Sequence, residues 1–175
     1  MPVNWKGLED RLVQAIKDRQ AKDEDSFAKL IVDEYDRAVV FNGQDNLLGN
    51  AVTVTNKSIF ESALRSAFTL AKLARSASEA QNVMRTFINM GIIGYWMGGQ
   101  LGFTNPPPGA VSVVTNMVVF PGVPPDVKIS NASKPEVFVR ELVVRLQSHA
   151  MTVNIVTSGV TSSGVPVVLS ISGIN

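Results

Sequence analysis

Between Thr86 and Pro125 the chain runs for forty residues without one Asp, Glu, Lys, Arg or His. Since 18% of the whole chain is charged, about seven charges would be expected in a stretch of this length. A soluble protein needs charge on the surface that it shows to water, so most of this stretch must be covered. The cover is the chain's own core, another protein subunit or a membrane. A second run, 147–175, also lacks Asp, Glu, Lys and Arg.

The remaining composition is that of a folded protein. The 175 residues fit one domain with a sizeable core, and 45% of them are hydrophobic. A net charge of +1 gives no electrostatic reason to expect nucleic-acid binding. Residues 1–45 hold seven basic and ten acidic side chains, so we predict that this first quarter is solvated and that much of the rest is covered.

Hydrophobic residues that recur every three or four positions predict five helices, at 4–19, 27–41, 58–75, 78–97 and 133–151. Three of these begin with the pattern of a capping box, in which Ser is followed three residues later by Glu or Gln: Ser58 with Glu61, Ser78 with Gln81, and Ser133 with Glu136. Near the end of the fourth helix, Gly91, Gly94 and Gly98 have the spacing that lets another backbone approach closely.

Two segments are predicted to be extended. Six prolines exclude helix from 99–132, and the Val-rich piece 111–120 within it has β character. The tail, 153–175, has two β-like pieces on either side of a Ser/Gly turn; it forms a hairpin, or it pairs with the sheet of a neighbouring subunit. The predicted fold class is mainly α: a helical body at 1–98, an extended arm at 99–132, a helix packing on the body at 133–152, and an extended tail or hairpin at 153–175.

Residues for catalysis are scarce. The absence of cysteine excludes disulfides and thiol chemistry. The one histidine, His149, stands late in the final predicted helix, where the helix dipole favours it. The acidic run 23–25 lacks the pattern of a calcium loop, and the glycines at 91–102 lack the lysine of a phosphate-binding loop. We therefore predict no enzyme activity, no cofactor-binding residue and no metal site.

The uncharged run does contain residues suited to protein–protein contact. Aromatic side chains and prolines bury a large area while losing little conformational freedom. For Tyr95 and Trp96 the chain's own core is an equally good explanation, whereas the arm beyond them favours an interface. The candidate interface residues are Tyr95, Trp96, Phe103, Pro106, Pro107, Pro108, Val111, Phe120, Pro121, Val165 and Val167.

Several short motifs occur in a familiar order: Tyr-Asp-Arg-Ala at 35–38, Gly-Asn-Ala-Val at 49–52, Asn-Lys-Ser at 56–58, Gly-Tyr-Trp-Met-Gly at 94–98, Pro-Pro-Pro-Gly at 106–109 and Pro-Gly-Val-Pro-Pro at 121–125. Over residues 25–150 this order resembles small virion structural proteins of large contractile-tailed bacteriophages, especially those of cyanobacteria and other aquatic hosts. The resemblance implies no catalytic residues. It implies many copies in a symmetric assembly such as a tail, neck or baseplate.

The expected function is therefore a structural subunit of a bacteriophage virion, assembled in the host cytoplasm, whose partners are other copies of itself and neighbouring virion proteins. Neither nucleic acid nor a membrane is expected as a direct partner. The alternative is a small protein that binds an apolar ligand or a membrane through its Gly-rich helix, although the apolar run from Met90 to Gly99 is too short to span a bilayer. On the first interpretation, deletion of 153–175 leaves the helices intact and abolishes assembly.

Overall fold

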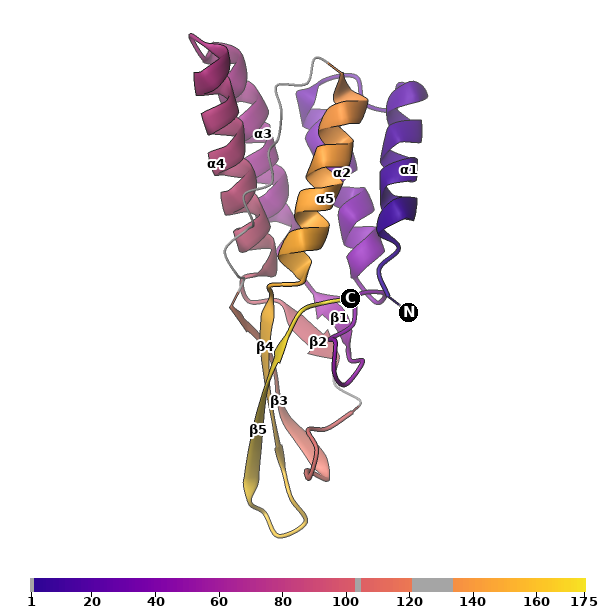
Figure 1. Cartoon of the computed structure of the whole chain (residues 1–175), viewed down its shortest axis with the longest axis vertical. Coiled ribbons are helices and arrows are strands. Elements are labelled where there is room, and N and C mark those ends of the chain that lie inside the picture. The colour runs from indigo at the N-terminus through magenta and orange to yellow at the C-terminus, as the bar shows by residue number, and fades with distance from the viewer. Residues whose placement is uncertain (1, 103–104, 121–133) are drawn as a thin grey trace.

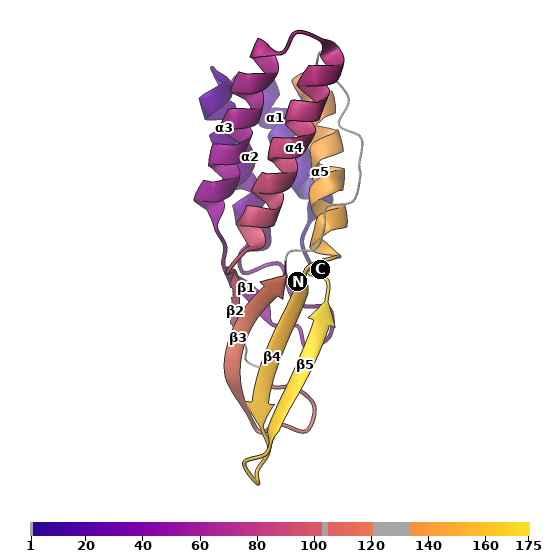
Figure 2. The same cartoon turned by 90° about the vertical axis from the view of Figure 1, so that its left-hand side faces the viewer.

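The computed structural model describes residues 2–102, 105–120 and 134–175. They form an elongated molecule, with the helices at one end and a narrow sheet projecting from the other (Figures 1 and 2). The helices are α1 (Trp5–Lys17), α2 (Glu24–Val39), α3 (Lys57–Leu73), α4 (Ala77–Trp96) and α5 (Pro135–Ala150). The strands are β1 (Ala51–Val54), β2 (Gln100–Gly102), β3 (Ser112–Phe120), β4 (Asn154–Val160) and β5 (Pro166–Ser172). The five predicted helices are confirmed and the fold is mainly helical, but two small sheets accompany the helices, so it is mixed rather than purely α.

The helix starts are less well predicted than the helices themselves. Asp23 caps α2, since its side chain accepts a hydrogen bond from the Ser26 N–H (2.7 Å), and α2 begins at Glu24, before its predicted start at residue 27. Ser76, not Ser78, caps α4 by accepting from the Glu79 N–H (3.1 Å). Ser58 lies inside the first turn of α3 and is not its cap. The remaining predicted cap, Ser133, lies outside the described residues. The periodicity of the helix interiors thus locates a helix better than its capping pattern does.

The helices α3 and α4 pack closely as a hairpin (Figure 2). Both glycines at this contact are buried, and a Cβ added to Gly91 would lie 2.8 Å from the Ala63 Cβ and from the Phe60 ring. A Cβ added to Gly94 would overlap Ile59. The glycine spacing therefore admits side chains of α3, where the sequence pattern predicted a neighbouring backbone.

The strands form two antiparallel sheets whose partners are distant in the sequence. In the smaller sheet, β1 pairs with β2, and Val52 stands opposite Leu101. In the larger sheet the order is β3–β4–β5. Its first strand comes from the predicted extended arm and the other two come from the tail, so the two segments pair with each other within one chain. The tail is a β-hairpin, which was one of the two predicted alternatives.

The hairpin is joined firmly to the helices. The backbones of Gln44 and Asn175 exchange two hydrogen bonds (2.9 and 2.8 Å). Beside them, the buried Asp45 carboxylate accepts from the backbone N–H groups of Leu47 (3.0 Å) and Asn50 (2.9 Å). At the root of the hairpin, four aliphatic side chains are buried in the same core as the helices: Val153, Ile155, Ile171 and Ile174. Deletion of 153–175 would remove part of the core of the helices, which argues against the expectation that it leaves them intact.

Candidate functional site

Two acidic residues of α2, Glu34 and Asp36, make hydrogen bonds with side chains of other elements. Glu34 is buried and accepts hydrogen bonds from Arg11 Nε (2.7 Å) and Arg37 Nη1 (2.6 Å), so it links α1 to α2. Asp36 accepts from the Tyr95 hydroxyl (2.9 Å) and the Thr55 hydroxyl (2.6 Å). Each carboxylate is thus engaged by groups of the chain itself. Their arrangement holds the helices together and leaves no reactive pair.

The pKa shifts of the ionisable groups nearby favour ion pairing and do not favour proton transfer. Burial alone would raise the pKa of Asp33, but the hydrogen bond and charge of Lys57, whose Nζ lies 2.5 Å away, lower it below its usual value. Burial raises the pKa of Tyr35, and burial together with the neighbouring Tyr35 and Asp36 raises that of Tyr95. Both phenols therefore stay protonated at neutral pH, which removes them as general bases.

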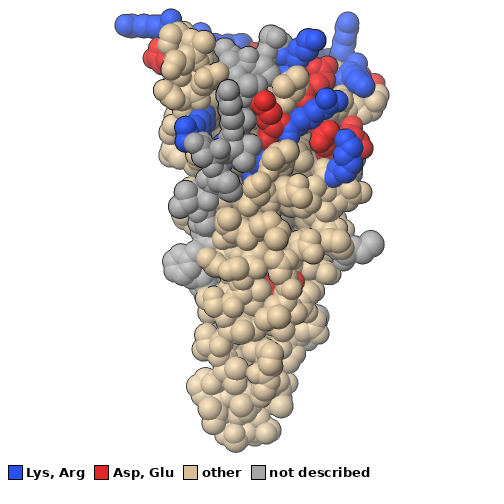
Figure 3. All heavy atoms as spheres, viewed as in Figure 1, with Lys and Arg blue, Asp and Glu red and all other residues tan. Residues whose placement is uncertain are grey.

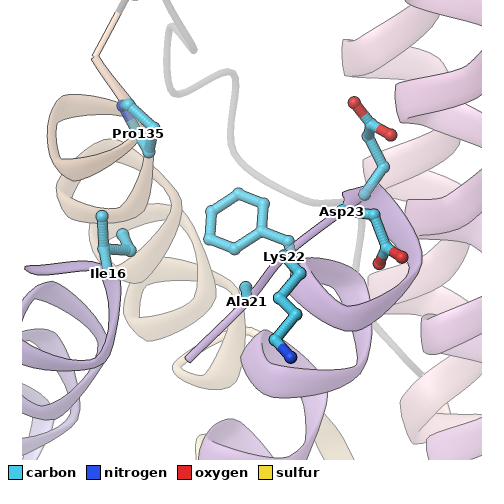
Figure 4. Close-up of a pocket in the computed structure, with 7 residues that line it drawn as sticks. Ile16, Ala21, Lys22, Asp23 and Pro135 are labelled. Carbon is cyan, nitrogen blue, oxygen red and sulfur yellow. The ribbon is translucent and has the colours of Figure 1, made fainter. Parts of the chain in front are cut away.

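A small pocket opens where the end of α1, the start of α2 and the start of α5 meet (Figure 4). Figure 4 shows Ile16 and Pro135 on one side of it and Asp23 across from them. The acidic residues that line it are already occupied, because Asp23 caps α2 and Glu24 pairs with Lys72. The mixed apolar and acidic lining offers no set of converging groups that would orient a ligand.

The helix α5 carries the histidine. His149 and Arg145, one turn apart, are fully buried, and Arg145 Nη2 donates a hydrogen bond to the Asn89 side chain of α4. Within residues 2–102, 105–120 and 134–175, no three His, Cys, Asp or Glu side chains are grouped so as to hold a metal ion.

The feature that sets this molecule apart is the distribution of its charge. We define the β lobe as residues 105–120 and 153–175, which contain β3, β4 and β5 and the segments that join or precede them. It has no Asp, Glu, Lys, Arg or His. Figure 3 shows nearly all blue and red atoms on the helical end of the face in view, while the strand end is tan. The lobe projects away from the helices, so much of this neutral surface is open to solvent (Figure 1).

The two faces of the β4–β5 hairpin differ in burial. Ile155 and Ile171 stand opposite each other on the inner face, as do Gly159 and Val167 nearer the tip. This face is covered: a Cβ added to Gly159 would lie 2.7 Å from the Ala110 Cβ and 3.3 Å from Pro107, both in the segment that leads into β3. The outer face of β5 is exposed, and its residues are Pro166, Val168, Ser170 and Ser172. One face of the hairpin is therefore covered by the chain, and the outer face of β5 is exposed.

The structure brings several predicted interface residues into this lobe. Val111 and Val165 are 66% and 55% exposed, and Pro108 is also exposed. Pro106 and Val167 are half-buried, while Pro107 is buried against the sheet. Phe103 and Pro121 lie outside the described residues, and Phe120 is described only through its backbone in β3. Val168, which is 67% exposed, is not among the candidate interface residues, although it lies in the same β-like piece of the tail as Val165 and Val167.

Tyr95 and Trp96 are a correction to the predicted interface. Both are completely buried near the end of α4, and their rings lie 5.3 Å apart in an edge-to-face arrangement. Tyr95 also packs on Tyr35, at a centroid distance of 4.7 Å. They fill the chain's own core, which was the competing explanation, and cannot anchor a partner from that position.

Among the described residues, no helix combines the length and the apolar character needed to cross a bilayer. Comparisons with protein-family models, with curated proteins and with solved structures give no match.

Proposed function

We propose that this chain is a structural subunit of a bacteriophage virion, in a tail, neck or baseplate, which acts through multi-copy protein–protein assembly. The observation that carries the assembly part is the β lobe, a projecting structure with no ionisable side chain. The virion part is supported by the resemblance in motif order described above.

The physical argument concerns the free energy of exposing the lobe. Its exposed valines lie in a neutral surface of Ser, Thr, Asn, Gly and Pro, so covering them removes apolar area from water without desolvating a charge. Apolar burial stabilises by roughly 25 cal/mol per Å² before the cost of association. Repeated copies multiply modest contacts through their high effective concentration. A charge-free projection is therefore suited to contacts between subunits.

The direct test is sedimentation velocity of the purified protein over a hundredfold range of concentration. We expect the average mass to rise with concentration. Val165→Lys, which places a charge at the hairpin tip, should reduce this rise. A matched control is Leu73→Lys, because Leu73 is an even more exposed apolar residue, 74% exposed, at the end of α3 in the body.

Two results would contradict the proposal. One is a strict monomer at every concentration, and the other is an equal effect of the two lysine variants. The alternative of an apolar-ligand or membrane protein predicts instead that the monomer floats with liposomes. For the virion part, antibodies raised against the protein should label intact phage particles of the source host at one fixed position.

A further inference from the structure

The β lobe contains a sheet edge that pairs with no other strand of the described residues. The strand β5 pairs with β4 on one side, and in the described residues no strand pairs with its other side (Figure 2). Its ladder with β4 is continuous, without a register shift, whereas the other outer strand, β3, has two. Natural sheets protect such edges with charged side chains, bulges or internal prolines. The edge of β5 has none of these beyond Pro166 at its first position.

The hydrogen bonds at the two ends of the hairpin show which backbone groups point outward. The Thr161 N–H donates to the Val165 carbonyl (2.9 Å), and the Gly173 N–H donates to the Val153 carbonyl (2.8 Å). Hydrogen-bonded pairs alternate with non-hydrogen-bonded pairs along an antiparallel ladder. Residues 167, 169 and 171 therefore direct their backbone groups toward β4, and residues 166, 168, 170 and 172 direct theirs away from it.

One of these outward positions lacks a donor, and one acceptor is already engaged. Pro166 has no N–H to donate. The Ser172 carbonyl already accepts a hydrogen bond from the Asn46 side chain (3.2 Å). The groups that remain along the edge are the carbonyl of Pro166, both groups of Val168, both groups of Ser170, and the N–H of Ser172.

This set of groups is complementary to itself when the strand is reversed. We propose that β5 pairs antiparallel with β5 of a second copy of this chain, about a two-fold axis at Leu169. In that register each Val168 faces the partner copy's Ser170, and the two exchange both backbone hydrogen bonds. The Ser172 N–H meets the Pro166 carbonyl, while the missing donor of Pro166 falls opposite the occupied acceptor of Ser172. Six hydrogen bonds form, and no available group of the edge is left over.

Neighbouring registers form fewer hydrogen bonds between the two copies. A shift that places Val168 opposite Val168 sets the Ser170 carbonyl against the proline nitrogen. A shift that places Ser170 opposite Ser170 sets the Val168 N–H against the carbonyl that Asn46 occupies. Each leaves edge groups without partners, and an unpaired buried backbone group costs about 1–3 kcal/mol. The pattern of the edge thus selects one register.

The side chains agree with a second copy as the occupant. In the proposed register, Val168 and Ser170 alternate across the axis on the outer face, and the two Leu169 side chains meet on the inner face. No like charges approach each other, because the lobe contains none. The product is a six-stranded sheet, with the two charged helical bodies at opposite ends of a neutral connector. This inference deepens the proposed function, on which it rests for the assumption that copies associate, by naming the surface and the register.

Single cysteines test the register directly, since the chain has no cysteine of its own. In the proposed pairing, Leu169 faces itself across a non-hydrogen-bonded pair with a Cα separation of about 4.5 Å, which a disulfide can bridge. Leu169→Cys should therefore form a covalent dimer as the main species under mild oxidation. Ser163→Cys, at the exposed hairpin tip, is the matched control and should stay monomeric, because the two tips point in opposite directions.

A second variant, Ser170→Pro, tests the same pairing independently in case Leu169→Cys misfolds. The Ser170 N–H points away from β4, so Ser170→Pro leaves the ladder of the hairpin intact. It should raise the dimer dissociation constant by about tenfold or more, since two of the six bonds are lost. Circular dichroism and the melting temperature of the monomer should stay unchanged.

The outcomes separate this inference from the proposed function. If wild-type protein associates but Leu169→Cys does not cross-link, or Ser170→Pro associates normally, the β5 pairing is wrong and the assembly proposal stands. Equal cross-linking of both cysteine variants, or association into open chains through a second edge, also overturns the two-fold register. A wild-type protein that stays monomeric overturns both proposals.

Discussion

The helical body and the β lobe differ in how their surfaces meet water. The body carries ion pairs such as Lys6–Glu9 (2.9 Å) and Arg65–Glu61 (2.6 Å) on its surface, and its buried apolar side chains form one core. The lobe has no ion pair to make, and it shows water a mixture of hydroxyls, amides and valines. The comparison teaches that one chain can carry two kinds of surface, one charged and ion-paired on the body and one neutral on the lobe. In the proposed function, the neutral surface makes the contacts between copies.

The largest expected effect concerns the core of the body. Trp96→Ala should lower the free energy of unfolding by about 3–5 kcal/mol, because it empties a fully buried site among aromatic rings. Met97→Ala, at the next position but 56% exposed, should change it by less than about 0.5 kcal/mol. Urea denaturation followed by circular dichroism measures both. Equal effects would mean that the end of α4 is not packed as described.

The second prediction locates the boundary between the two regions. Ile171→Ala should lower the free energy of unfolding by about 2–4 kcal/mol, since Ile171 belongs to the lobe in sequence but to the common core in space. Val168→Ala, three residues earlier on the exposed face of the same strand, should change it by less than about 0.5 kcal/mol. A silent Ile171→Ala would show that the lobe folds independently of the body.

The third prediction concerns pH and applies to the body alone. The lowered pKa of Asp33 stabilises the fold above its ordinary value of 3.8, and this contribution is lost as the pH falls below it. The raised pKa of its partner Lys57 stabilises the fold below the ordinary 10.5 and is lost as the pH rises through the folded value. Lys57→Met should therefore cost about 0.2–1 kcal/mol between these limits and flatten the acid branch of a stability profile. An unchanged acid branch would contradict the ion pair.

The smallest expected effect on folding lies at the tip of the lobe. Val165→Lys should change the free energy of unfolding by less than about 0.5 kcal/mol, because this side chain makes no core contact. The measurement is thermal unfolding at a concentration where the protein is monomeric. A loss of several kcal/mol would show that the tip contributes to the stability of the folded subunit and does not serve only as surface for contact.

The elements that sequence alone predicted well are those set by local pattern. The helices appear within a few residues of their predicted ranges, because hydrophobic periodicity is itself a property of each helix. The sheets could not be paired in this way. Val52 finds Leu101 and β3 finds β4 only after distant segments have folded together, and no local signal encodes such pairings.

The candidate site was predictable in part for a related reason. Absence of charge drew attention to Val111 and Val165, which are exposed, but the same signal marked Tyr95 and Trp96, which are buried. Composition alone does not distinguish a side chain that is buried in the core from one that is exposed and could bind a partner. The edge groups of Val168 and Ser170 depend on the register of β5, which follows from the turn at 161–164, where Gly164 adopts a φ of 80° that other residues rarely take.

The neutrality of the β lobe also determines how solution conditions should act on the proposed contacts between copies. At physiological ionic strength, salt screens the attraction between exposed charges that lie more than about 8 Å apart. The lobe has no charged side chain, so salt has no attraction to screen there. Sodium chloride should therefore weaken the ion pairs on the surface of the helices and leave the proposed contacts between copies unchanged. Sulfate, which is excluded from apolar surface, should strengthen those contacts. Contacts of this kind should be about equally strong in fresh water and in sea water.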